Sequence, residues 1–86
     1  MKSLFEQQGE FFKAMGSPSV ADGVPLTECV SLSYSLIWEE VVDETLRALN
    51  KYKADPSLEN KVELADVLLD SVYVLLHCAH SIGIHF

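Results

Sequence analysis

Acidic side chains gather in two short stretches of the sequence, and their spacing suggests metal chemistry. Seven of the 13 acidic residues belong to these two acidic clusters. The clusters are Glu39, Glu40, Asp43 and Glu44, followed by Glu63, Asp66 and Asp70. Residues three or four apart share a helix face, so each cluster would present a stripe of carboxylates. Such carboxylates repel one another, and a divalent cation would relieve the repulsion.

The donor atoms indicate the kind of ion. Ligands that are all oxygen suit Mg²⁺, or Mn²⁺, rather than zinc. A helical di-iron site would use Glu-x-x-His pairs, and no acid stands three residues before His77, His80 or His85. The expected ligands are Glu40, Asp43, Glu63 and Asp66. Asp70 is expected to be a further ligand or a carboxylate that contacts the ligands rather than the metal. The alternative is that these acids form an ordinary solvated surface.

Three helices are expected to position the clusters in an all-α fold without strands. Residues 2–15 predict a short first helix, and the Gly-Ser-Pro sequence after it predicts its end. Residues 16–25 predict a loop. A long second helix is expected from about residue 26 or 27, with Thr27 as its N-cap, to about Lys53.

The third helix is expected to begin at the break formed by Ala54, Asp55 and Pro56. Asp55 suits an N-cap and Pro56 suits the first helical position. Gly83 is expected to end this helix after Ile82. Because the connection is short, the second and third helices should form an antiparallel hairpin.

Counting residues from the turn places the two clusters opposite each other. Asp43 and Asp66 each lie about eleven residues from the turn, which is roughly 16 Å along the hairpin. The pairs expected at one level are Asp43 with Asp66, Glu40 with Asp70, and Glu63 with Arg47. The carboxylates of both helices can therefore face one gap.

Composition and charge limit the class of protein. The 86 residues allow a single domain, 1–86, and 49% hydrophobic residues predict that it folds. A net charge of −7 leaves too few cations for a nucleic-acid-binding face. The first residues lack the apolar core of a signal peptide, and three acids in the apolar stretch 62–84 argue against a membrane span. Two cysteines, Cys29 and Cys78, make no disulfide framework, so we expect a cytoplasmic protein with reduced, buried thiols.

Both clusters resemble motifs of the all-α nucleoside triphosphate pyrophosphatase superfamily, which includes the MazG proteins. The family's Glu-Glu-x-x-Glu is similar to residues 39–43 (Glu-Glu-Val-Val-Asp), and its Glu-x-x-Asp is similar to residues 63–66 (Glu-Leu-Ala-Asp). Residues 65–74 also resemble its Ala-Asp-x-Leu-x-Asp-x-x-Tyr-Val segment. Residues 11–18 resemble the opening of a compact branch that is similar to phosphoribosyl-ATP pyrophosphohydrolase-like and phage or integron MazG-like proteins. The departures are Asp43 in place of Glu, Ser33 roughly where relatives carry Arg, and His77 where this branch carries Gly.

The resemblance implies hydrolysis of a (deoxy)nucleoside triphosphate to the monophosphate and pyrophosphate, in the service of nucleotide-pool cleaning. Glu40, Asp43, Glu63 and Asp66 would hold Mg²⁺, which offsets the phosphate charge and lowers the pKa of the attacking water. Glu40 would thereby serve catalysis directly. Glu39 would be a further ligand or would orient this water.

Further residues are candidates for holding the substrate. Phosphate could be bound by the cations near the turn, which are Arg47, Lys51, Lys53 and Lys61. Trp38 and Tyr73 could form an aromatic slot for the base. The alternatives are solvated lysines and aromatic packing. His77 and His80 are expected at packing and rim positions, because no third metal ligand accompanies them.

A hairpin with one short helix cannot cover its own apolar surface, so we expect a helical bundle completed by self-association. The resemblance implies a homodimer or a dimer of dimers whose subunits bound each nucleotide pocket. Two other functions stay open at this point. One is a non-catalytic acidic interaction module, and the other is phosphoribosyl-ATP hydrolysis.

Overall fold

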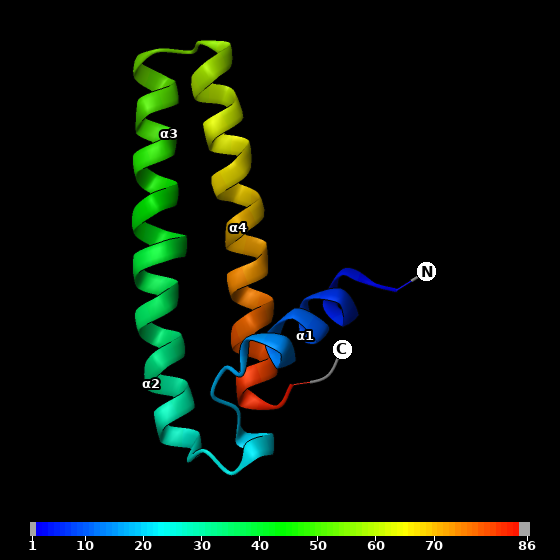
Figure 1. Cartoon of the computed structure of the whole chain (residues 1–86). Helices are drawn as coiled ribbons and strands as arrows, with labels where there is room; N and C mark the ends of the chain where they lie inside the picture. The colour runs from blue at the N-terminus through cyan, green and yellow to red at the C-terminus, as the bar shows by residue number, and fades with distance from the viewer. Residues whose placement is uncertain (1, 85–86) are drawn as a thin grey trace.

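Helices make up nearly all of the chain. The computed structural model describes residues 2–84, and that part contains no strand. The elements are α1 (Leu4–Met15), the 3₁₀ turn η1 (Val20–Asp22), α2 (Leu26–Leu36), the π-helical segment η2 (Ile37–Asp43), α3 (Glu44–Ala54) and α4 (Leu58–Ile82). α2, η2 and α3 follow one another without a break and form one rod, which runs antiparallel to α4 (Figure 1). The predicted all-helical fold and its antiparallel hairpin are confirmed.

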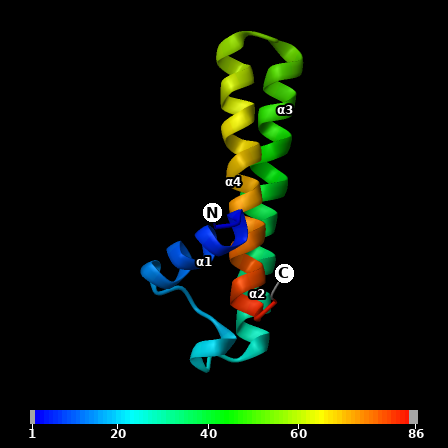
Figure 2. The same cartoon turned by 90° about the vertical axis from the view of Figure 1, so that its right-hand side faces the viewer.

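The molecule is elongated because the hairpin is longer than the helix packed on it. α1 crosses the C-terminal half of α4, while the half of the hairpin near the turn consists of two helices alone (Figures 1 and 2). The radius of gyration is 14.9 Å, whereas a compact chain of this length would have about 12 Å. The fold therefore has an α1 end, where three helices meet, and a turn end, where two do.

Two glycines end helices where the sequence predicts. Gly16 closes α1 with φ of 66°, and its N–H donates to the carbonyl of Lys13. Gly83 closes α4 with φ of 86°, and its N–H donates to the carbonyls of Ala79 and His80. Both conformations lie in the left-handed region that glycine adopts without steric cost.

The start of α2 differs from the prediction. Pro25 is the N-cap, and Thr27 lies inside the first turn, so the assignment of Thr27 as N-cap is wrong. The ring of Pro25 fixes φ, here −55°, with an extended ψ of 138°. The carbonyl of Pro25 then accepts the N–H groups of Glu28 and Cys29. The expected loop 16–25 also contains η1, which the sequence did not indicate.

The start of α4 also differs from the prediction. Ser57 is the N-cap, its hydroxyl accepts the N–H of Asn60 at 3.2 Å, and the helix begins at Leu58. Asp55 and Pro56 belong to the connection instead. A residue before proline is biased towards extended backbone, and Asp55 is extended with φ of −141° and ψ of 91°. The side chain of Asn60 donates to the carbonyl of Asp55 at 2.9 Å and holds the turn closed.

The apolar core of a single chain is small. Its buried apolar residues are Phe12, Cys29, Ala48, Cys78 and Ala79. Both thiols are buried, as predicted, and burial raises the pKa of Cys78. Burial disfavours the charged thiolate, so Cys78 behaves as a small apolar residue here.

Much apolar surface stays exposed along both rods. Leu68, Leu69 and Leu75 of α4 are each 47–53% exposed, and Leu46 and Trp38 of the other rod are 55% and 61% exposed. The accessible surface is 6153 Å², whereas a compact monomer of this mass exposes about 5,100 Å². No helix within residues 2–84 has the length and apolar character needed to cross a membrane.

Candidate functional site

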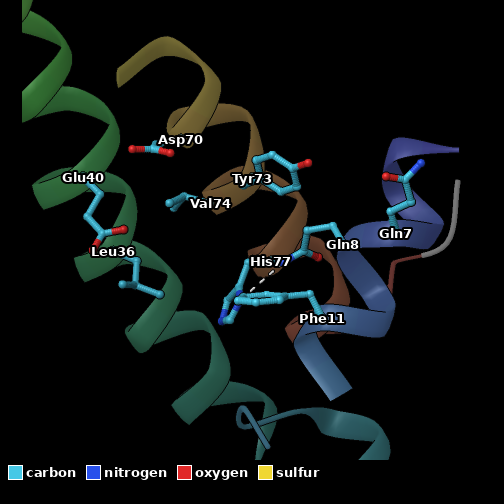
Figure 3. Close-up of a pocket in the computed structure, with 9 residues that line it drawn as sticks. All are labelled: Gln7, Gln8, Phe11, Leu36, Glu40, Asp70, Tyr73, Val74 and His77. Atoms are coloured by element: carbon cyan, nitrogen blue, oxygen red, sulfur yellow. Dashed lines mark hydrogen bonds between the residues drawn. The ribbon is translucent and has the colours of Figure 1, made fainter. Parts of the chain in front are cut away.

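A cleft lies where α1 approaches the hairpin. Its volume is about 570 Å³, within the roughly 300–1,000 Å³ typical of small-molecule sites. The lining comprises Gln7, Gln8 and Phe11 of α1, Leu36 of α2, Glu40 of η2, and Asp70, Tyr73, Val74 and His77 of α4 (Figure 3). We call this space the α1 cleft. It brings a residue from each acidic cluster together with aromatic and amide groups.

The acidic side of the α1 cleft is formed by Glu40 and Asp70. They come from neighbouring antiparallel helices, and the cleft lies beside both (Figure 3). Glu40 and Asp70 lie at a similar height along the hairpin, as predicted by counting residues from the turn. Both side chains are exposed, so neither carboxylate has to lose all its water in a single chain.

A π-helical segment carries the first acidic cluster. η2 spans Ile37–Asp43 and contains Glu39, Glu40 and Asp43. Its hydrogen bonds run from i to i+5, so it changes the angular spacing of these side chains relative to an α-helix. π segments inside α-helices occur frequently at functional sites. The sequence reading assumed a regular α-helix and missed this segment.

Other predicted ligands lie beside cations near the turn. Asp43 pairs with Arg47, with 3.1 Å between Oδ2 and Nη2, and Glu63 pairs with Lys51, with 2.8 Å between Oε2 and Nζ. The hydrogen bond from Lys51 to Glu63 and the charge of Glu63 raise the pKa of Lys51. Arg47, Lys51 and Glu63 also line a smaller cleft of about 260 Å³. Arg47 and Glu63, which were expected at one level, both line this cleft, but Glu63 pairs with Lys51 and Arg47 pairs with Asp43.

The remaining predicted residues are exposed and lie outside the lining of the α1 cleft. They are Glu39, Glu44, Asp66, Lys53 and Lys61. Among residues 2–84, no three acidic, imidazole or thiol groups are close enough to hold a metal ion by themselves. Mg²⁺, however, is usually bound by one or two carboxylates together with substrate phosphates. The oxygen donors of Glu40 and Asp70 fit this mode of binding.

The opposite side of the α1 cleft is formed by a buried amide and an imidazole. Gln8 is only 2% exposed, and its Nε2 lies 3.5 Å from Nδ1 of His77 (Figure 3). Its Oε1 has no hydrogen-bond partner among the described residues. The ring of His77 packs edge-on against Phe12 at 4.6 Å. Burial, and secondly the neighbouring His80, lower the pKa of His77 and favour the neutral ring.

His80 and Gly9 fix the position of α1 on α4. The His80 ring stacks on Phe5 at 4.0 Å, and its Nε2 lies 3.0 Å from the carbonyl oxygen of Phe5. A Cβ on Gly9 would lie 2.6 Å from Cε1 of His80, so only glycine allows this approach. The packing and rim positions predicted for His77 and His80 are confirmed.

The aromatic residues proposed for the base separate in the structure. Tyr73 lines the α1 cleft, whereas Trp38 is 61% exposed and is not among the lining residues. Sequence reasoning missed Gln8 and Phe11. A signal for Gln8 was present, because it lies four residues before Phe12 and thus interrupts the apolar face of α1 with an amide.

Known proteins give no further guide to this site. No protein-family model, curated protein or solved structure matches the chain.

Proposed function

We propose that this protein is an Mg²⁺-dependent nucleoside triphosphate pyrophosphohydrolase, which converts a (deoxy)nucleoside triphosphate to the monophosphate and pyrophosphate. The observation that carries the proposal is the composition of the α1 cleft. Glu40 and Asp70, one from each acidic cluster, line it together with Tyr73 and an amide. The cleft thus offers carboxylates for a metal–phosphate group and an aromatic, polar surface for a base. A role in cleaning the nucleotide pool would follow.

Glu40 and Asp70 would hold Mg²⁺ directly, and Asp43, Glu63 and Asp66 remain the other predicted ligands. Asp43 and Glu63 are in exposed ion pairs, and such pairs contribute only about 0–1 kcal/mol to stability. Both carboxylates can therefore exchange their cationic partners for a metal ion. When bound, Mg²⁺ would offset charge on the phosphate oxygens and make the attacking water more acidic.

The other predicted residues act through charge and position. Glu39 would orient the water from the π-helical segment that also carries Glu40. Arg47 and Lys51 would turn from Asp43 and Glu63 towards phosphate oxygens once those acids hold a metal. Lys53 and Lys61 would contribute positive potential near the turn.

We also propose that the active form is a homodimer or a dimer of dimers. The support is the exposed apolar surface of both rods, with Leu69 at 53% and Leu46 at 55% exposure. Exposed apolar patches larger than a few hundred Å² are rare on monomers. Sedimentation equilibrium at micromolar concentration should give a mass of at least twice 9.6 kDa, and a strictly monomeric mass would contradict this assembly.

Product analysis of a nucleotide panel tests the activity. Each common ribo- and deoxynucleoside triphosphate, and phosphoribosyl-ATP, is incubated with and without Mg²⁺, and pyrophosphate is measured against inorganic phosphate. We expect pyrophosphate only with Mg²⁺. Combining Glu40→Gln with Asp70→Asn should lower the rate at least about 100-fold, because several kcal/mol of charge stabilisation is lost.

Glu59→Gln is the matched control, since Glu59 is an exposed acid in the first turn of α4, outside the α1 cleft. Its activity should equal that of the wild type. Release of inorganic phosphate alone would contradict attack at the α-phosphorus. Absence of any product, together with no thermal shift in Mg²⁺ and full tolerance of the double substitution, would instead favour a non-catalytic acidic interaction module.

A further inference from the structure

Both clefts open on the same side of the hairpin. The α1 cleft includes Asp70 and His77 of α4, and the smaller cleft near the turn includes Glu63. These three residues follow one another at intervals of seven, and a helix drifts by only about 20° over such an interval. They therefore share one side of α4, which we call the front face of the hairpin. Figure 2 shows α1 on this side, to the left of the hairpin.

The opposite side of α4 and of α3 carries leucines. Side chains two positions apart on an α-helix point in nearly opposite directions, because each residue turns the helix by about 100°. On α4, Leu68 stands two positions before Asp70, and Leu75 stands two positions before His77. On α3, Leu49 stands two positions before Lys51 of the smaller cleft. These leucines therefore point away from the clefts.

The same spacing continues the apolar side along the rest of that rod. Tyr34 stands two positions before Leu36 of the α1 cleft, and Trp38 follows Tyr34 by one helical turn. Leu46 stands two positions after Glu44 of the smaller cleft. We call this side the back face, and its residues are each 44–73% exposed: Tyr34, Trp38, Leu46, Leu49, Leu68 and Leu75.

The back face is uncovered within the part of the chain that the structure describes. In Figure 2, α1 and η1 lie to the left of the hairpin, and no helix of residues 2–84 lies to its right. The accessible surface of 6153 Å² exceeds that of a compact monomer by about 1,000 Å². A standard dimer buries about 800 Å² on each partner. The excess is thus close to what one chain contributes to a stable dimer.

We propose that the back face binds the back face of a second copy, so that two hairpins form a four-helix bundle around a two-fold axis. This inference rests on the self-association proposed above and stands whether or not the clefts hydrolyse nucleotides. An apolar face two helices wide fits an identical face. The carboxylates that line the clefts stay outside, so two chains of net charge −7 can meet without bringing these acids together.

This arrangement has a consequence for the site. Each α1 cleft would open outwards and be lined by one chain alone, since the second copy lies on the opposite side of the hairpin. The family resemblance implies instead that two subunits bound each pocket. The two arrangements differ in which face the partner covers, and this difference can be measured.

Trp38 reports directly on the back face, because it is the only tryptophan in the chain. A single chain leaves it 61% exposed. Sedimentation equilibrium and quenching of its fluorescence by acrylamide are measured on the same dilution series. We expect weak quenching wherever the mass is at least twice 9.6 kDa, and strong quenching wherever the mass is 9.6 kDa. Strong quenching at the doubled mass overturns the back face as the interface while self-association holds. A monomer at every concentration overturns both.

A double substitution tests the leucines themselves. Leu46→Lys combined with Leu75→Lys should raise the dissociation constant of the dimer at least about 100-fold, because apolar contacts are replaced by buried charges. Lysine also reduces the net negative charge, so general repulsion between the chains cannot cause the loss. Both side chains are exposed in the single chain, and circular dichroism should show unchanged helical content.

Met15→Lys is the matched control, since Met15 is an exposed apolar residue at the end of α1, away from the back face. Its dissociation constant should stay within about twofold of the wild type. Equal weakening by the control and the double variant overturns the assignment to the back face. The quenching of Trp38 in the wild type decides the question even where a variant fails to fold.

Mixing two inactive variants tests whether each cleft belongs to one chain. Glu40→Gln and Asp70→Asn are prepared separately, mixed and allowed to exchange subunits. A cleft lined by one chain then always lacks one carboxylate, so pyrophosphate release should stay at the level of the separate variants. Recovery of activity on mixing overturns the back-to-back arrangement. Absence of pyrophosphate release by the wild type overturns the hydrolase, whereas the mass and the quenching of Trp38 still decide the interface.

Discussion

The α1 end and the turn end of the hairpin use the same two rods but form different surfaces. At the turn end, a cleft of about 260 Å³ is lined mainly by charged residues, with Lys51 paired to Glu63. At the α1 end, a cleft of about 570 Å³ has a buried amide, an imidazole and exposed aromatic rings. The carboxylates of Glu40 and Asp70 contribute its acidic side.

The helix α1 accounts for the difference. Two helices in contact leave only a shallow groove, because each presents a convex surface to its partner. α1 adds a further wall to the groove. Where α1 packs on α4, a polar side chain such as Gln8 of α1 becomes buried. A two-helix surface can therefore attract ions, whereas a three-helix surface can also recognise shape and hydrogen-bonding groups.

A substitution at the contact between α1 and α4 should disrupt the α1 end and leave the turn end intact. Gly9→Ala would place a Cβ 2.6 Å from Cε1 of His80, whose ring is held by stacking on Phe5. We expect a loss of about 1–3 kcal/mol in the free energy of unfolding, as in other overpacked contacts. An alanine in an unobstructed helix would instead stabilise by about 0.5–1 kcal/mol. Urea denaturation measures the change.

A second substitution identifies the clash as the cause. In a His80→Ala background the obstruction is gone, so Gly9→Ala should cost clearly less than in the wild type. Equal costs in the two backgrounds would show that the α1 contact does not depend on the approach of Gly9 to His80.

The turn end is held by side-chain hydrogen bonds from Asn60 to Asp55, and their loss should cost less stability than a clash at the α1 end. Asn60 is 8% exposed and donates to the carbonyl and carboxylate of Asp55 at 2.9 and 3.3 Å. Asn60→Ala should lower the free energy of unfolding by about 1 kcal/mol, the usual net value of a hydrogen bond. Asn50→Ala is the control, because Asn50 is exposed on α3 and alanine is the better helix former. A loss of equal size in both variants would refute a specific role for Asn60.

The smallest expected effect is a dependence of stability on pH, which arises from His77 at the α1 end. The pKa of His77 in the folded chain lies below its ordinary value of 6.5, because burial disfavours the charged ring. As the pH falls through 6.5, the unfolded chain gains a proton there before the folded chain does. Stability is therefore full above this pH and declines as the pH falls towards the folded pKa. Thermal unfolding between pH 7.5 and 5.5 should show this decline.

His77→Gln keeps a polar side chain but removes the titration, so its stability should depend less on pH over the same interval. An NMR titration of the His77 ring should give a pKa below 6.5. A value at or above 6.5 would mean that the imidazole is not held in its neutral form.

The sequence predicted the path of the chain because helix signals are local. Gly16 and Gly83 end their helices as predicted, and the break near Pro56 creates the hairpin. Counting along two straight rods was enough to place Glu40 level with Asp70. The N-cap residues were harder to predict from the sequence. Thr27 and Asp55 were the predicted N-caps, whereas Pro25 and Ser57 are the N-caps in the structure. Neighbouring candidates differ by about 1 kcal/mol or less, and tertiary contacts such as that of Asn60 decide between them.

The sequence by itself determined the all-helical hairpin, its glycine-capped ends and the shared level of Glu40 and Asp70, because helical periodicity, glycine and proline act within a few residues. Only the tertiary structure decided how α1 crosses α4, which acids share a cleft, and that Gln8 is buried. These features depend on residues about seventy positions apart, such as Gln8 and His77. The angle between packed helices follows from the fit of their side chains, and no local pattern specifies it.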